Sequence, residues 1–143
     1  MTIEQLSVFV ENKPGKLVGA LEALAAAGLD IRALSLADTS DFGILRIIVD
    51  DPALALGVLG DAGYLVKSSD VIPVAVGDRP GGLSSVLRIL ADMGVNVEYA
   101  YAFVAHSHDK AFVILRVDDN DAAANALAQG GVTMLTPAEV YGM

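Results

Sequence analysis

One internal repeat constrains the fold of this chain more than any other feature of its sequence. The run Asn12-Lys13-Pro14-Gly15-Lys16-Leu17 returns 66 residues later as Asp78-Arg79-Pro80-Gly81-Gly82-Leu83. Each run follows an apolar segment of strand length and precedes leucines spaced i, i+4 and i+7. That spacing is typical of one buried helix face. Both copies therefore predict a strand, a polar turn and a helix at one constant offset.

The segments that follow also match between the copies. Each helix is expected to end at a glycine, Gly28 or Gly94, which is a common helix stop. In the first copy we predict strands at 6–10, 29–37, 42–49 and 64–67, with helices at 17–27 and 52–62. In the second copy we predict strands at 71–76, 95–105, 110–117 and 132–135, with helices at 81–93 and 120–129. A short helical turn capped by Thr136 is expected in the tail.

The order strand, helix, strand, strand, helix, strand predicts an α+β fold of two tandem ferredoxin-like βαββαβ modules. Each module is expected to form an antiparallel four-stranded sheet with two helices on one face. We place the first domain at residues 1–69 and the second at 70–143. Between the last strand of the first copy and the first strand of the second lie only Ser68, Ser69 and Asp70, so we predict no flexible linker.

The composition favours association with another chain. Hydrophobic residues make up 54% of the sequence, and the mean hydropathy is +0.54. Modules of about half this length have marginal cores on their own, and one face of a one-sided sheet must be solvated or paired. We therefore expect a homodimer, although a dense core accounts for the hydropathy almost as well.

Charge and motif content exclude several classes of function. The formal net charge of −9 argues against nucleic acids and anionic membranes as partners, since both attract clustered Lys and Arg. The chain contains no cysteine, so thiolate chemistry is excluded. No apolar run reaches membrane-spanning length and the start lacks a signal-peptide pattern, which favours a cytoplasmic protein. Because no catalytic, phosphate-binding or dinucleotide motif is evident, we expect no enzyme activity and no cofactor.

The two Pro-Gly runs, each leading through a helix to Gly-Leu-Asp-Ile or Gly-Val-Asn-Val, resemble the signature of ACT domains. The resemblance covers the whole chain, which is similar to stand-alone proteins made of two tandem ACT domains. It implies a regulatory module that binds a free amino acid at an interface between modules. The residues that it assigns to the ligand are Asn12, Lys13, Pro14, Gly15, Lys16, Leu17, Asp30 and Ile31 in the first copy, and Asp78, Arg79, Pro80, Gly81, Gly82, Leu83, Asn96 and Val97 in the second. A frequent ACT pattern has an amide at both polar positions, whereas each copy here has one amide and one carboxylate, so the two sites need not bind alike.

The chemistry of these positions suits a zwitterion. N–H groups at the start of the first helix, together with the helix dipole, can hold a carboxylate. Asp30 or Asp78 can neutralise an ammonium group, and Asp38 and Asp41 favour a basic or imidazole side chain. The alternative is that each Pro-Gly pair only makes a tight turn. The φ angle of Gly15 separates these roles, because a positive φ would make the glycine necessary for the turn itself.

Two weaker patterns in the sequence resemble cation sites. His106 and His108 have metal-like spacing, but we predict solvated loop residues and no metal site. Asp118, Asp119 and Asp121 precede a helix, and we expect them to cap it. The main alternative to amino-acid binding is a ligand-free structural or dimerisation module. In either case a chain with no attached catalytic domain would act through a separate enzyme or regulator.

Overall fold

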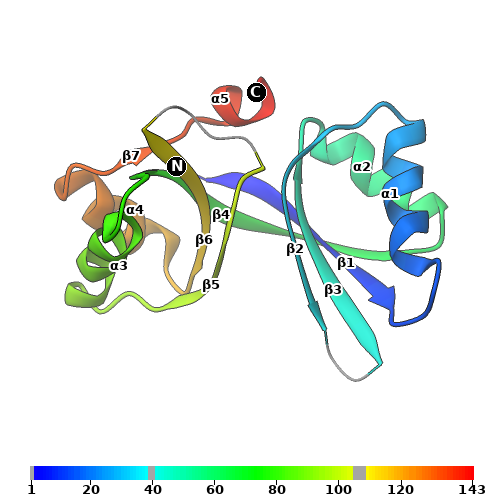
Figure 1. Cartoon of the computed structure of the whole chain (residues 1–143), viewed down its shortest axis with the longest axis horizontal. Helices are drawn as coiled ribbons and strands as arrows, with labels where there is room; N and C mark the ends of the chain where they lie inside the picture. Colours follow the sequence, from blue (N-terminus) through cyan, green and yellow to red (C-terminus); the bar gives the residue numbers. More distant parts are fainter. Residues whose placement is uncertain (1, 39–40, 105–108) are drawn as a thin grey trace. The chain divides into compact units, whose positions relative to one another are not determined.

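The computed structural model describes residues 2–38, 41–104 and 109–143, and Figure 1 shows its elements. Within these residues the strands are β1 (Ile3–Glu11), β2 (Ile31–Asp38), β3 (Phe42–Val49), β4 (Leu65–Gly77), β5 (Val97–Ala102), β6 (Lys110–Val117) and β7 (Thr133–Met134). The helices are α1 (Lys16–Ala26), α2 (Pro52–Asp61), α3 (Gly82–Asp92), α4 (Asn120–Gln129) and α5 (Pro137–Tyr141). The element order confirms the predicted α+β pattern. His106 and His108 lie outside the described residues.

The chain folds into two compact units, whose main parts are Glu4–Ser69 and Asp70–Tyr141. In the N-terminal unit the strand order is β2-β3-β1-β4, and in the C-terminal unit it is β5-β6-β4-β7. The pairs β1–β3, β2–β3, β4–β6, β4–β7 and β5–β6 are all antiparallel. In each unit two helices pack side by side on one face of the sheet, α1 with α2 and α3 with α4 (Figure 1). Both units therefore have the ferredoxin-like arrangement that the repeat predicts.

The residues that we expected to separate the two copies belong to the sheet. Ser68, Ser69 and Asp70 lie within β4, which runs without interruption from Leu65 to Gly77. The separate strands expected at 64–67 and 71–76 are thus parts of one strand. The intervening residues include neither glycine nor proline, so they adopt the extended conformation of their neighbours without strain.

Each unit has its own hydrophobic core between its helices and its sheet. In the N-terminal unit the core alternates along β1 through Leu6, Val8 and Val10, which are at most 3% exposed. In the C-terminal unit Ile72, Val74 and Val76 of β4 occupy the corresponding positions. This period of two directs the intervening side chains, such as Phe9 and Glu11, to the face without helices.

The predicted helix caps are confirmed. Asp51 accepts a hydrogen bond from the Leu54 N–H, and Asp119 accepts one from the Ala122 N–H. In the tail, Thr136 Oγ1 accepts from the Glu139 N–H while Glu139 Oε1 accepts from the Thr136 N–H. This reciprocal pair is a capping box.

The helices are short. The longest, α1 and α3, each have 11 residues. Among the described residues, none of the helices is long and apolar enough to cross a membrane.

Candidate functional site

The connection between β1 and α1 is the segment to which the sequence assigns the first ligand site. The Asn12 N–H donates to the Asp41 carbonyl at 3.0 Å, and the Lys13 N–H donates to the Glu11 carbonyl at 2.8 Å. Neither α1 nor α3 has a side-chain cap on its first turn, whereas α2 and α4 have aspartate caps. Among the described residues, the first-turn N–H groups of α1 therefore have no side-chain acceptor, as a site for an anionic group requires.

Gly15 and Gly81 both adopt the left-handed conformation, with φ of +87° and +84°. The sequence left open whether these glycines serve a ligand or the turn. Their positive φ makes them necessary for the turn, because side chains with a Cβ are strained in this region. Loss of binding in a Gly15 variant would therefore not by itself identify a ligand contact.

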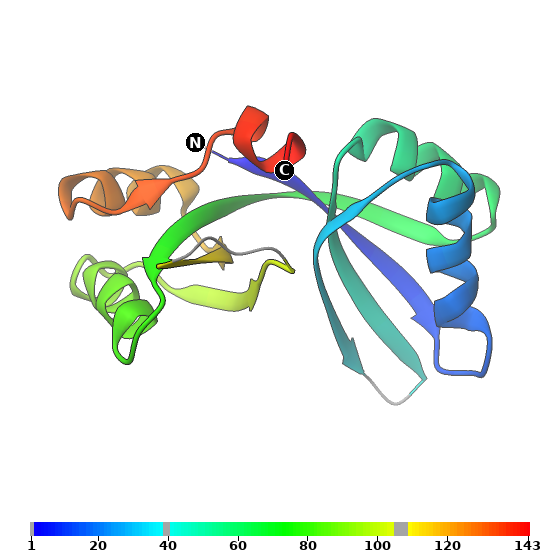
Figure 2. The same cartoon turned by 45° about the horizontal axis from the view of Figure 1, so that its top comes forward.

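Asp30 lies at the opposite end of the N-terminal unit from Asn12. The Asn12 N–H bonds to Asp41 just before β3, and the Asp50 N–H bonds to the Asp30 carbonyl just after β3. The eight residues of β3 separate these points by roughly 26 Å at about 3.3 Å per residue. Both views show the β1–α1 and α1–β2 connections at opposite ends of α1 (Figures 1 and 2).

The C-terminal unit repeats this separation. The Asp78 N–H donates to the Asp109 carbonyl before β6, and the Asp118 N–H donates to the Asn96 carbonyl after it. The predicted groupings of Asn12, Gly15 and Asp30, and of Asp78, Gly81 and Asn96, are therefore not assembled within one unit. The reason is that the first helix of each unit leads the chain back to the end of the sheet at which the first strand began. The next strand therefore starts at that end.

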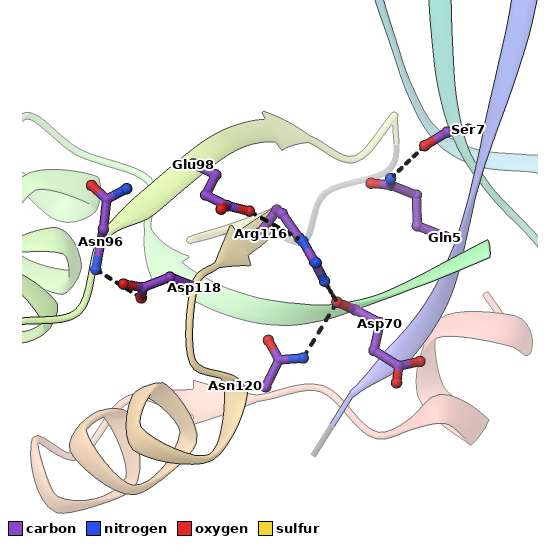
Figure 3. A network of polar contacts seen from close by, with 8 residues as sticks. All are labelled: Gln5, Ser7, Asp70, Asn96, Glu98, Arg116, Asp118 and Asn120. Carbon is purple, nitrogen blue, oxygen red and sulfur yellow. Dashed lines mark hydrogen bonds and ion pairs between the residues drawn. The ribbon is translucent and has the colours of Figure 1, made fainter. Parts of the chain in front are cut away.

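Two aspartates that sequence reasoning did not assign to the site hold the backbone at Asp30 and Asn96. Asp50 Oδ1 accepts from the Asp30 N–H at 3.0 Å. Asp118 Oδ1 accepts from the Asn96 N–H at 3.1 Å, as drawn in Figure 3. In the reverse direction, the Asp50 N–H donates to the Asp30 carbonyl, and the Asp118 N–H donates to the Asn96 carbonyl. Two hydrogen bonds thus join the residues of each pair, and we call each such pair a clamp. Asp118, expected only to cap α4, thus bonds to the backbone of Asn96 just before β5, while Asp119 caps the helix.

The side chains near these clamps form ion pairs. The Arg32 guanidinium, whose side chain is 12% exposed, pairs with the Asp30 carboxylate. In the C-terminal unit Arg116 pairs with Glu98 at 3.3 Å and donates to the Asp70 carbonyl at 2.8 Å (Figure 3). A ligand ammonium at Asp30 would share that carboxylate with Arg32. Ile31 and Val97 begin the adjoining strands and are half-buried.

Two cavities flank the first β1–α1 connection. One, of about 140 Å³, is lined by Val10, Glu11, Asn12, Lys13, Leu17, Leu36, Asp38 and Gly43. The other, of about 420 Å³, is lined by Phe9, Glu11, Lys16, Phe42, Ala62, Gly63, Tyr64 and Leu65. Glu11 lines both cavities and pairs with Lys13 at 3.3 Å. Asn12, Lys13 and Leu17 are therefore brought together with Asp38, whereas Lys16 lines the other cavity. Pro14 and Gly15 belong to the connection between β1 and α1.

The second β–α connection has the same backbone hydrogen bonds but a tighter packing. Gly82 stands where the first copy has Lys16, and Gly77 where it has Glu11. A Cβ added to Gly82 would lie 1.9 Å from the Gly77 carbonyl oxygen, and one added to Gly77 would lie 3.1 Å from Arg79 Nε. The backbone itself thus fills the space that side chains border in the first copy. Asp78, Pro80 and Leu83 remain exposed beside it.

Tyr64 was not assigned to the site from the sequence. Its hydroxyl donates to the Lys16 carbonyl at 2.7 Å. The hydroxyl also lies close to Gly19, because a Cβ added to Gly19 would be 2.7 Å from Tyr64 Oη. The available signal was an asymmetry of the repeat, because Gly19 and Tyr64 correspond to Ser85 and Val132 in the second copy. No group of three or more His, Asp and Glu side chains within the described residues could hold a metal ion.

Comparison with known proteins places this geometry in a family. Protein BT0572 from Bacteroides thetaiotaomicron is 36% identical, with a TM-score of 0.93 over 100% of this chain and 98% of that one. The regulatory subunit of aspartate kinase from Thermus thermophilus, in its ligand-free form, is 20% identical, with a TM-score of 0.65 over 88% of this chain and 91% of that one. Aspartate kinase from Synechocystis is 23% identical, with a TM-score of 0.61 over 94% of this chain and 26% of that one. The last two likenesses show a shared fold.

A search of curated proteins found no significant match. The family described as "ACT domain pair" matches residues 1–139. The resemblance seen in the two Pro-Gly repeats is thereby confirmed over nearly the whole sequence, and this chain belongs to the ACT domain family as a domain pair.

Proposed function

We propose that this protein is a non-enzymatic regulatory module that binds a free amino acid at an interface between ACT modules. The observation that carries the proposal is the gathering of both charge signs at the first β1–α1 connection. Lys13, Glu11 and Asp38 line one cavity together with the Asn12 amide. A zwitterion needs donors for its carboxylate and acceptors for its ammonium group, and this set supplies both.

The strand register supports a site shared between modules. Because β3 separates Asn12 from Asp30 by its whole length, one ligand of amino-acid size cannot reach both within one unit. A site that uses both positions requires the β1–α1 connection of one module and the β2 entry of another. We propose the same division for the domains, at residues 1–69 and 70–143.

The shared fold with an aspartate kinase regulatory subunit supports a regulatory role that is exercised on a separate partner protein. Dimer formation fits the exposed apolar side chains on β2, a strand at the end of the sheet order in its unit. Leu34 is 42% and Leu36 is 51% exposed there. Exposed apolar side chains on an edge strand favour pairing with another chain.

A thermal-unfolding screen of the full chain with each common amino acid tests this function. A ligand that binds only the folded state stabilises it by about 2.7 kcal/mol at a concentration of 100 Kd. We expect a rise in Tm with a small group of amino acids at millimolar concentration, and chromatography should recover the ligand unchanged. No shift with any amino acid would favour a ligand-free structural or dimerisation module. Turnover of the ligand would instead indicate an enzyme.

A further inference from the structure

The cavity of about 420 Å³ lies within the N-terminal unit, between the end of β1, the start of β3 and the connection from α2 to β4. Its volume falls in the range of small-molecule sites, which is about 300–1,000 Å³. All its lining residues belong to one unit, so it needs no second module to exist. It is therefore a different place from a site shared between modules.

The walls of the cavity are apolar side chains that lie open to solvent. Phe42 is 46% and Leu65 is 64% exposed, and Phe9 adds a ring that is half-buried. The Tyr64 hydroxyl is engaged with the Lys16 carbonyl, so Tyr64 contributes its ring to the lining. Covering such surfaces with an apolar group is favourable at about 25 cal/mol per Å² of area removed from water.

Two further side chains of the lining, those of Glu11 and Lys16, bear opposite charges. Lys16 is exposed, and among the described residues its ammonium group has no ion-pair partner. Glu11 pairs with Lys13, but both side chains are exposed, at 44% and 68%. Exposed ion pairs of this kind contribute little to stability, so Glu11 is available to another ammonium group.

We propose that this cavity binds an α-amino acid with a bulky apolar side chain, aromatic or branched aliphatic. The side chain contacts Phe9, Phe42 and Leu65, the ligand carboxylate faces Lys16 and its ammonium group faces Glu11. This inference rests on the proposed function for the class of ligand. It adds a second site, apart from the one shared between modules, and the type of ligand side chain that this second site takes.

The C-terminal unit lacks the groups that form this site. Glu11 and Lys16 correspond to Gly77 and Gly82, and Tyr64 corresponds to Val132. The carbonyl of Gly77 also occupies the space beside Gly82. One chain therefore holds one site of this kind.

Isothermal titration of the full chain with leucine, phenylalanine, aspartate and lysine tests the proposal. We expect the two apolar amino acids to bind this cavity at one per chain, and aspartate and lysine to bind it at least about tenfold more weakly. Phe42→Ala and Leu65→Ala should each raise the Kd for the apolar ligands by about tenfold, and Lys16→Gln should raise it further. Leu54→Ala is the matched control, because Leu54 is 45% exposed on α2 and is not among the lining residues.

Three results would overturn the inference. If amino acids bind but Phe42→Ala and Leu65→Ala leave the Kd unchanged, the site lies elsewhere and the proposed function stands. If the two variants change the sedimentation of the ligand-free protein instead of the Kd, a second copy of the chain covers the cavity. Absence of binding by every amino acid would overturn the proposed function as well.

Discussion

Tyr64 Oη donates a 2.7 Å hydrogen bond to the carbonyl oxygen of Lys16, a residue 48 positions earlier in the chain. This bond ties the connection between α2 and β4 to the first turn of α1. Both residues line the larger cavity. The bond therefore couples the stability of the N-terminal unit to the shape of the proposed site.

The space for this bond depends on Gly19. A Cβ there would lie 2.7 Å from Tyr64 Oη, whereas Gly57 in α2 has no atom within 4 Å of an added Cβ. Gly57→Ala should stabilise the fold by about 0.5–1 kcal/mol through helix propensity. Gly19→Ala should give no such gain, because displacing Tyr64 costs about 0.5–1.5 kcal/mol of hydrogen bonding. Urea unfolding of both variants measures the difference, and equal stabilisation would contradict the contact.

The close approach of Gly82 to Gly77 predicts a large difference between corresponding positions of the repeat. Gly82→Ala should destabilise the protein by about 2–4 kcal/mol, because its Cβ would meet backbone rather than a movable side chain. Lys16→Ala, at the corresponding exposed position, should change the free energy of unfolding by about 0.5 kcal/mol or less. Chemical unfolding tests this, and similar losses in the two variants would refute the tighter packing of the second connection.

The left-handed conformation of Gly15 predicts that Gly15→Val destabilises the fold by about 1–2 kcal/mol, whether or not a ligand binds nearby. Asn12→Ala is a cleaner test of the ligand site, because the hydrogen bond from Asn12 to Asp41 uses the backbone N–H, which alanine keeps. We expect Asn12→Ala to keep its Tm without ligand and to show a smaller ligand-induced rise in Tm, because Asn12 lines the smaller cavity and not the larger one. Normal binding by a folded Asn12→Ala variant would remove Asn12 from the site.

Because Asp50 and Asp30 form a clamp just before β2, removing the Asp50 side chain should lower the stability of the protein without removing a ligand contact. Asp50→Ala should cost about 1 kcal/mol or more, because the Asp30 N–H loses its acceptor. Asp41→Ala is the control, since the carbonyl of Asp41, which the variant keeps, is the group that bonds to Asn12. In thermal unfolding, the Tm of Asp50→Ala should be lower than the Tm of Asp41→Ala. The reverse order would show that the clamp contributes little.

Asp30 itself requires a separate binding measurement, because its carboxylate already pairs with Arg32. If an ammonium group binds there, Asp30→Ala should weaken amino-acid binding by about tenfold or more at unchanged stoichiometry. A folded Asp30→Ala variant with normal affinity would exclude Asp30 from the site. Asp50→Ala, measured in the same titration, separates a lost contact from a displaced backbone.

The proposed homodimer can be measured by sedimentation at micromolar concentration. If β2 contributes to the interface, Leu34→Lys should weaken dimer formation through its charge, while Leu54→Lys on α2 should not. A 14.8 kDa monomer in the wild-type protein would contradict the prediction.

The sequence by itself determined the local structure of this protein. The repeated Pro-Gly runs with their leucine spacing identified both modules, and Asp51, Asp119 and Thr136 identified helix starts. These features depend on short-range physics, namely the helical period, the φ restriction of proline and the acceptor needs of a first helical turn. They lie within a few residues of one another, so the linear sequence displays them.

Only the tertiary structure decided which residues come together. Asn12 and Asp30 belong to one sequence signature, yet β3 holds them at opposite ends of the sheet because strand order and register depend on long-range pairing. Glu11, Lys16 and Tyr64 likewise line one cavity only because the start of α1 lies beside the residue that precedes β4. The approach of Gly82 to Gly77 is a steric fact of the folded backbone, and sequence spacing carries no measure of it.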